Sequence, residues 1–240
     1  FSQQKGETKN IQIEGGAQMQ EYELDADEYE ENKHFFLSHY FKENYDKALE
    51  NIPVINSGVN ITKIEVWVTN TTGEFENARN IVAFPDLGES DEDVIQSDYV
   101  LPGAYSQSVH PRDSVNILGQ LTSDYPNVRD INQVSNILMG APFNMRGGVD
   151  YEKIESARKL DPSEYKLNEQ LGYISLNSRL SSDKVLAVAF EYTVGGEVYR
   201  VGEFANGGVS APDALVLKLI KGTALTPDLS TWDLMMKNVY

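Results

Sequence analysis

Apolar residues recur every four positions over residues 28–49, the spacing that places side chains on one face of an α-helix. The recurring residues are Leu37, Phe41, Tyr45 and Leu49, with Ala48 beside them. Acidic residues at the start of this stretch suit the N-terminal end of a helix dipole. We therefore predict an amphipathic helix over residues 28–49, closed by Pro53.

Other stretches are typical of β-strands. Residues 61–69 alternate between two faces and residues 80–84 return after a Thr-Gly turn signal, which predicts a long hairpin. Residues 184–194 are apolar on both faces, as expected of a central strand. A Gly-Gly turn joins them to residues 197–204 in a second hairpin. Further strands are predicted at residues 10–14 and 18–24, which would form a hairpin around Gly15-Gly16, and at 164–167, 173–176 and 214–220.

Short helices are predicted at residues 130–139 and 151–160, and a last helix follows the capping-box pattern Ser230-x-x-Asp233. Strands in hairpins interrupted by helices predict an α+β fold with mainly antiparallel β-sheet and three to four helices. We expect a frayed leader over residues 1–17 and one segment over 18–240. The irregular residues 85–128 are expected to be functional, mobile or a junction between two lobes.

The net charge of the chain limits the classes of partner that it is expected to bind. The 240 residues carry 20 basic and 37 acidic side chains, a net charge of −17. Such a chain is repelled by nucleic acid and by anionic lipid, so we expect neither nucleic-acid binding nor direct membrane insertion. The absence of cysteine excludes disulfides and thiolate metal sites. We interpret the chain as a segment cut from a longer protein or as a mature processed form, because it begins at Phe1 without a visible signal peptide.

Candidate chemistry is sparse. The sequence has no phosphate-binding, dinucleotide-binding, nucleophile-elbow or zinc-protease motif, so we expect no enzyme, no catalytic residue and no cofactor. His34 and His39 would not converge on one metal if both lay on a helix. The best metal candidate is an acidic loop that offers the hard oxygens that calcium prefers, although a solvated loop explains it as well. Its carboxylates are Asp86, Glu89, Asp91 and Asp93.

Several stretches resemble the SprA/Sov family of gliding Bacteroidetes and their non-gliding relatives. The most specific are Ile61–Asn70 and Trp232-Asp-Leu-Met-Met-Lys-Asn-Val-Tyr240. The others are residues 29–37, 45–56, 171–177 and 185–193, and the resemblance spans roughly residues 18–240.

The resemblance implies a function in protein secretion. The family forms the outer-membrane translocon of the type IX secretion system, a very large β-barrel with soluble inserts on which cargo export and gliding adhesins depend. No active site is known in it. The expected role is thus a non-enzymatic soluble insert, not membrane barrel wall. Its expected partners are the rest of the translocon, other secretion-system proteins and secreted cargo.

The expected location is the cell envelope at the outer membrane. The extracellular face is favoured because bacterial barrels have long outer loops, with the periplasmic side as the alternative. Two other functions stay open. One is a carbohydrate-binding surface module, suggested by the many acids and tyrosines. The other is a calcium-stabilised adhesion module built on the acidic loop.

Overall fold

The computed structural model describes residues 25, 28–73, 75–100 and 109–240, and the predicted leader and the hairpin around Gly15-Gly16 lie outside these ranges. The strands are β1 (His34–Phe36), β2 (Val59–Val68), β3 (Arg79–Phe84), β4 (Glu152–Lys159), β5 (Tyr165–Asn168), β6 (Tyr173–Leu176), β7 (Leu186–Val194), β8 (Glu197–Val201) and β9 (Leu215–Lys221). The α-helices are α1 (His39–Glu43), α2 (Tyr45–Ala48), α3 (Leu121–Asp124), α4 (Val134–Met139) and α5 (Ser230–Leu234). Single 3₁₀ turns cover Asp113–Val115, Ile117–Gln120, Pro126–Arg129 and Pro162–Glu164.

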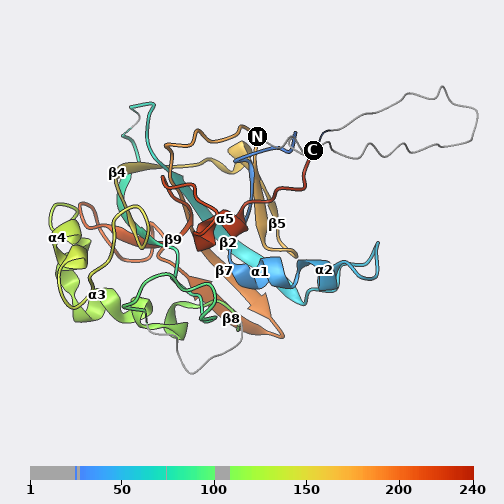
Figure 1. The fold of residues 1–240 in the computed structure, drawn as a ribbon, viewed down its shortest axis with the longest axis horizontal. Helices are drawn as coiled ribbons and strands as arrows, with labels where there is room; N and C mark the ends of the chain where they lie inside the picture. The colour runs from blue at the N-terminus through green and yellow to red at the C-terminus, as the bar shows by residue number, and fades with distance from the viewer. Residues whose placement is uncertain (1–24, 26–27, 74, 101–108) are drawn as a thin grey trace, which may run out of the picture.

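Two sheets form the framework (Figure 1). The larger has the order β2-β4-β3-β9-β7-β8, and β2 also pairs with β7, so five of its strands close into a ring. The smaller has the order β1-β6-β5. All pairs are antiparallel except β3 with β9. The fold is therefore α+β with mainly antiparallel strands, as predicted. Among the described residues, no helix has the length and apolar composition needed to cross a membrane.

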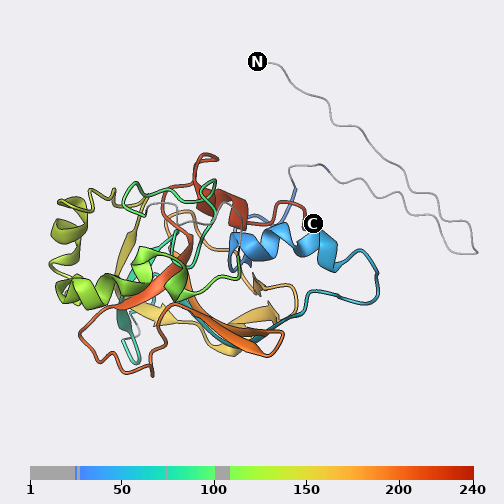
Figure 2. The ribbon, with the colours of Figure 1, turned by 90° about the horizontal axis from the view of Figure 1, so that it is seen from below.

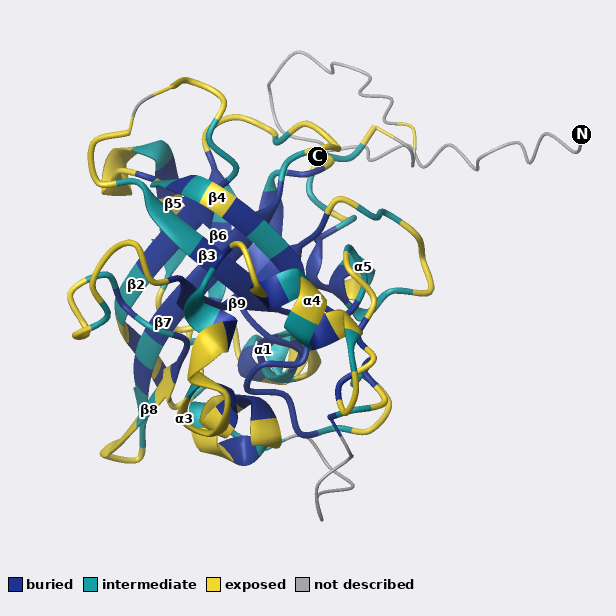
Figure 3. Ribbon diagram, turned by 90° about the vertical axis from the view of Figure 1, so that its left-hand side faces the viewer, coloured by how far each residue is buried: buried dark blue, intermediate teal, exposed yellow. Residues whose placement is uncertain are grey.

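The strands of the ring bury both of their faces. Along β7, Ala187 and Ala189 face the ring interior, where small side chains pack around the buried Trp67. Leu186, Val188 and Phe190 face the other way, into a larger core that the helices cover. Figure 2 shows the helical segments on one side of the strands, and Figure 3 shows that the buried positions concentrate in the strands. This two-sided burial explains why the β7 sequence is a continuous apolar run.

The prediction of one helix over residues 28–49 is wrong. The stretch contains β1, α1 and α2, with Ser38 in an extended conformation before α1 and Asn44 between the two helices. The predicted apolar stripe nevertheless faces the core at Leu37 and Phe41, which are buried. The three residues of β1 are all buried, and one face of a helix cannot bury three consecutive side chains. As a strand they pair with β6, which provides hydrogen-bond partners for their backbone groups.

The helix predicted over residues 151–160 is also wrong, because these residues form β4. The buried positions of β4 are Glu152, Ile154 and Ala157, so the spacing changes from two to three. The pairing of β4 with β3 shifts register here, and Ser156 has φ 50°. A bulge of this kind turns an alternating pattern into one that resembles a helix.

The long hairpin predicted over residues 61–84 does not form. β4 lies between β2 and β3 in the sheet, and the main partner of β2 is β7. The strand at 184–194 is central, as predicted, because β7 pairs with β2, β8 and β9. The predicted capping box is wrong in detail, because Leu229 precedes α5 and makes no side-chain cap.

Candidate functional site

The most unusual side-chain arrangement is a buried ion cluster, which we define as Lys218, Glu89 and His39. Lys218 is 0% exposed, and its Nζ donates to Glu89 Oε1 at 2.7 Å and to the Pro85 carbonyl oxygen. Glu89 Oε1 also accepts the His39 backbone N–H at 3.2 Å and lies 3.1 Å from His39 Nδ1. Three segments that are distant in sequence therefore meet at one carboxylate: α1, the chain after β3, and β9.

The histidine ring extends the cluster to a fourth segment. His39 Nε2 lies 2.9 Å from the Ser230 carbonyl oxygen at the start of α5. Both partners of the ring are acceptors, so a neutral imidazole donates to only one of them and an imidazolium donates to both. The ring is buried and has no path to swing outward without breaking these contacts.

Electrostatics within the cluster favour the ionised carboxylate. Burial raises the pKa of Glu89, but the charges of Lys218 and His39 outweigh it and lower that pKa to about 2. Asp86 behaves oppositely. Burial raises its pKa to about 6, even though its carboxylate accepts the backbone N–H groups of Gln96 and Ser97. The carboxylates of Asp86 and Glu89 therefore accept hydrogen bonds from other groups of the protein itself.

The four carboxylates of the acidic loop proposed from sequence do not lie together, because two are buried and two face solvent. Asp86 and Glu89 point inward, whereas Asp91 is partly exposed and Asp93 is exposed. Asp91 Oδ1 accepts the Asp93 backbone N–H at 3.0 Å, a local turn contact. Across the described ranges, no group of three or more His, Asp or Glu side chains is placed to hold a metal ion. His34 contacts Ser175 and Glu30, away from His39.

A polar pocket of about 230 Å³ opens beside the cluster. Its lining includes His39 from the cluster and Asp93 from the acidic loop, together with Asp228 and Asp233 near α5. Asp233 also pairs with Lys42 at 3.3 Å. The carboxylates give the pocket a negative lining, which attracts basic groups rather than anions.

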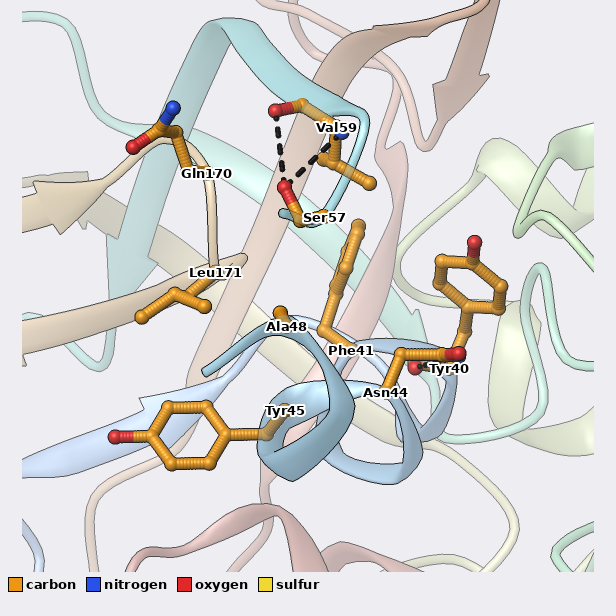
Figure 4. A pocket seen from close by; sticks show the side chains of 9 residues that line it. All are labelled: Tyr40, Phe41, Asn44, Tyr45, Ala48, Ser57, Val59, Gln170 and Leu171. Atoms are coloured by element: carbon orange, nitrogen blue, oxygen red, sulfur yellow. Dashed lines mark hydrogen bonds between the residues drawn. The ribbon is translucent and has the colours of Figure 1, made fainter. Parts of the chain in front are cut away.

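A second pocket lies between α1, α2, the start of β2 and the turn that holds Gln170 and Leu171, and Figure 4 shows the side chains that line it. Its lining includes the apolar side chains of Phe41, Val59 and Leu171. Its volume is about 20 Å³, enough for about one water molecule. This pocket is therefore a packing gap beside α1 and too small for an organic ligand.

Sequence reasoning identified Asp86 and Glu89 but missed Lys218, the partner of Glu89. The readable signal was a lysine inside an otherwise apolar strand, Leu215-Val-Leu-Lys-Leu-Ile-Lys221. A buried lysine is rare unless it is paired, so such a position indicates a buried anion. His39 carried no comparable signal, because its carboxylate partner is 50 residues away.

Fold and cluster together define an α+β domain whose buried ionisable groups hold distant segments together. A family model matches residues 1–181, and its description is SprA N-terminal, motility-related/secretion protein. The chain belongs to this family, which associates it with secretion at the cell envelope and confirms the resemblance found in the sequence. No curated protein matches the sequence.

Proposed function

We propose that the chain is a non-enzymatic domain of the outer-membrane translocon of the type IX secretion system, required for export of cargo and of the adhesins used in gliding. The observation that carries this proposal is the family match over residues 1–181. The outer membrane is its proposed location, on the extracellular face, with the periplasmic side as the alternative. Its partners are the rest of the translocon, other secretion-system proteins and exported cargo.

The geometry of the ion cluster supports a role without catalysis. A catalytic acid or base must reach its substrate within hydrogen-bond distance or through one water. Glu89 and Lys218 are 3% and 0% exposed, and each is paired with the other. Holding the segment after β3 against the sheet accounts for the lowered pKa of Glu89, and neither Glu89 nor Lys218 is exposed to a substrate.

An in-frame deletion of residues 18–240 in the encoding gene tests the proposal. We expect the remaining protein to reach the outer membrane while cargo accumulates in the periplasm and colonies stop spreading. The readouts are the amount of the protein in the outer-membrane fraction, the cargo in the medium and the colony diameter. Secretion at the wild-type level in the deletion strain would overturn the translocon role.

A charge-removing double variant tests the absence of catalysis. Glu89→Gln with Lys218→Met removes both charges of the pair while keeping side chains of similar size. We expect this variant, once its fold is verified by circular dichroism, to secrete cargo normally. Lost secretion with an intact fold would contradict a purely structural role of these two charges.

A further inference from the structure

Between α2 and β2 the chain exposes three consecutive apolar residues, Ile52-Pro53-Val54, followed by the half-buried Ile55. Ile52 and Val54 are 75% and 64% exposed, and Pro53 between them is also exposed. Single exposed apolar residues are ordinary on protein surfaces, but consecutive ones are unfavourable unless they form a contact. We call residues 52–54 the apolar knob.

The backbone around the knob is held by hydrogen bonds. The Val54 N–H donates to the Asn51 carbonyl at 3.0 Å, and the Asn56 N–H donates to the Ala48 carbonyl at 2.9 Å. Ala48 is itself buried at the end of α2. Figures 1 and 2 both show this segment extending away from the strands. A projection with fixed ends loses less conformational entropy on binding than a flexible loop does, so it is suited to insertion.

Charges near the knob restrict what can cover it. Asp46 and Glu50 are exposed on the approach to the knob, with Lys47 as the basic residue between them. An anionic bilayer would repel this surface. A contact with a second copy would bring together two chains that each carry −17, which disfavours it. The remaining occupant is a different protein with a basic surface.

We propose that the apolar knob inserts into an apolar pocket of another protein, and that lysine or arginine side chains at the rim of that pocket face Asp46 and Glu50. This inference stands apart from the proposed secretion role, because it rests on the exposure and charges of residues 46–54. Ile52 and Val54 fill the pocket, and the acidic groups orient the approach.

Photo-crosslinking in living cells tests the contact. A photoreactive amino acid replaces Ile52 in the full-length protein, and a matched control replaces Met139, which is 61% exposed at the end of α4. Figures 1 and 2 place α4 and the knob at opposite ends of the fold. We expect an adduct with one other protein from position 52 only, mapped by mass spectrometry to an apolar pocket with basic residues around it.

Binding of the purified partner to the full-length protein gives the second readout. We expect Ile52→Asp and Val54→Asp each to weaken binding roughly ten- to hundredfold, the effect of losing one buried aliphatic side chain. Met139→Asp should leave binding unchanged, and added salt should weaken the wild-type interaction. Because all three sites are exposed, urea midpoints should stay near the wild-type value.

Four results would overturn the proposal. They are an adduct only with another copy of the same chain, an adduct within one polypeptide, unchanged affinity of Ile52→Asp for the partner, and binding of wild type to vesicles containing phosphatidylglycerol that is lost in Ile52→Asp. The secretion role is tested separately by the deletion strain, so the two proposals can fail independently.

Discussion

Replacing Lys218 by methionine tests whether the ion cluster holds the segment after β3 on the sheet. Methionine keeps much of the apolar length of lysine but removes the ammonium group. Glu89, 3% exposed, then keeps a buried carboxylate with His39 as its remaining side-chain partner. Removal of one member of a buried pair typically costs about 3–5 kcal/mol, a large part of the roughly 5–15 kcal/mol by which a domain is stable.

The measurement is the free energy of unfolding in urea at pH 7, for Lys218→Met, Glu89→Gln and the double variant. We expect the double variant to be more stable than Lys218→Met, because no buried carboxylate is left without its cation. The coupling free energy from this cycle should be at least about 1.5 kcal/mol. A cost of Lys218→Met below about 1 kcal/mol, or additive effects, would refute this account of the cluster.

The pH dependence gives an independent check. Glu89 has its pKa lowered from 4.5 to about 2 in the folded protein, so its contribution to stability is present above pH 4.5 and is lost as the pH falls through about 2. Without Lys218, burial dominates and raises the pKa of Glu89. The destabilisation of Lys218→Met relative to wild type should therefore shrink as the pH falls below neutral. A destabilisation that is constant with pH would contradict the reasoning.

Three further predictions concern other parts of the fold. Burial raises the pKa of Asp86 from 3.8 to about 6, so its contribution to stability is complete below pH 3.8 and is lost as the pH rises through about 6. In urea titrations, the unfolding free energy of wild type relative to Asp86→Asn should change by up to about 3 kcal/mol between pH 4 and pH 7. A difference that does not change with pH would contradict this expectation. Gly172→Ala should lower the unfolding free energy by about 2–4 kcal/mol, because φ is +64° and the added Cβ would lie 2.3 Å from Phe41 Cγ. The control Gly195→Ala, with φ +59° and nothing within 4 Å of the added Cβ, should lower it by only about 1–2 kcal/mol in the same assay. Equal losses would show that the close approach to Phe41 is unimportant. Millimolar calcium should leave the melting temperature unchanged, because the acidic loop turns two of its carboxylates inward; a rise of several degrees would support the calcium-stabilised module instead.

Most strands could be predicted from the sequence, including β2 and β9, whose pairings with β7 contain register shifts. Tyr173–Leu176 matches its predicted range, and Leu186–Val194 lies within the range predicted for it. β7 is recognisable because the ring and the helix-covered core bury its two faces, which requires a continuous apolar run. The same continuous apolar run predicts that β7 is a central strand of its sheet.

The elements that were mispredicted have patterns altered by their surroundings. In β4 the bulge near Ser156 adds one residue, so Ile154 and Ala157 are three apart although both face the ring interior. In residues 28–49 the apolar spacing is real, but the three residues before Leu37 pair with β6 as strand β1, so no single helix spans the stretch. Neither the bulge nor the pairing partner can be read from local periodicity, because each depends on a strand elsewhere in the chain.

The site could be predicted even less fully. Glu89 and Lys218 are 129 residues apart, and only the paired lysine makes the burial of Glu89 tolerable. From sequence, Glu89 is one of several acids in a loop and looks like its exposed neighbours. The lysine within an apolar strand indicated a buried anion, but nothing in its surroundings indicated which of the 37 acidic residues it meets.

The ion cluster and the apolar knob are linked through α1 and α2. Glu89 accepts the backbone N–H of His39, the first residue of α1, and Phe41 two residues later packs over Gly172. α2 follows directly after Asn44, and the knob follows α2. The direction in which the knob projects is therefore set by contacts of α1 with the core. A buried ion pair typically contributes less to net stability than apolar packing would, so we expect the cluster to act mainly by positioning α1, and with it the surface that we propose binds another protein.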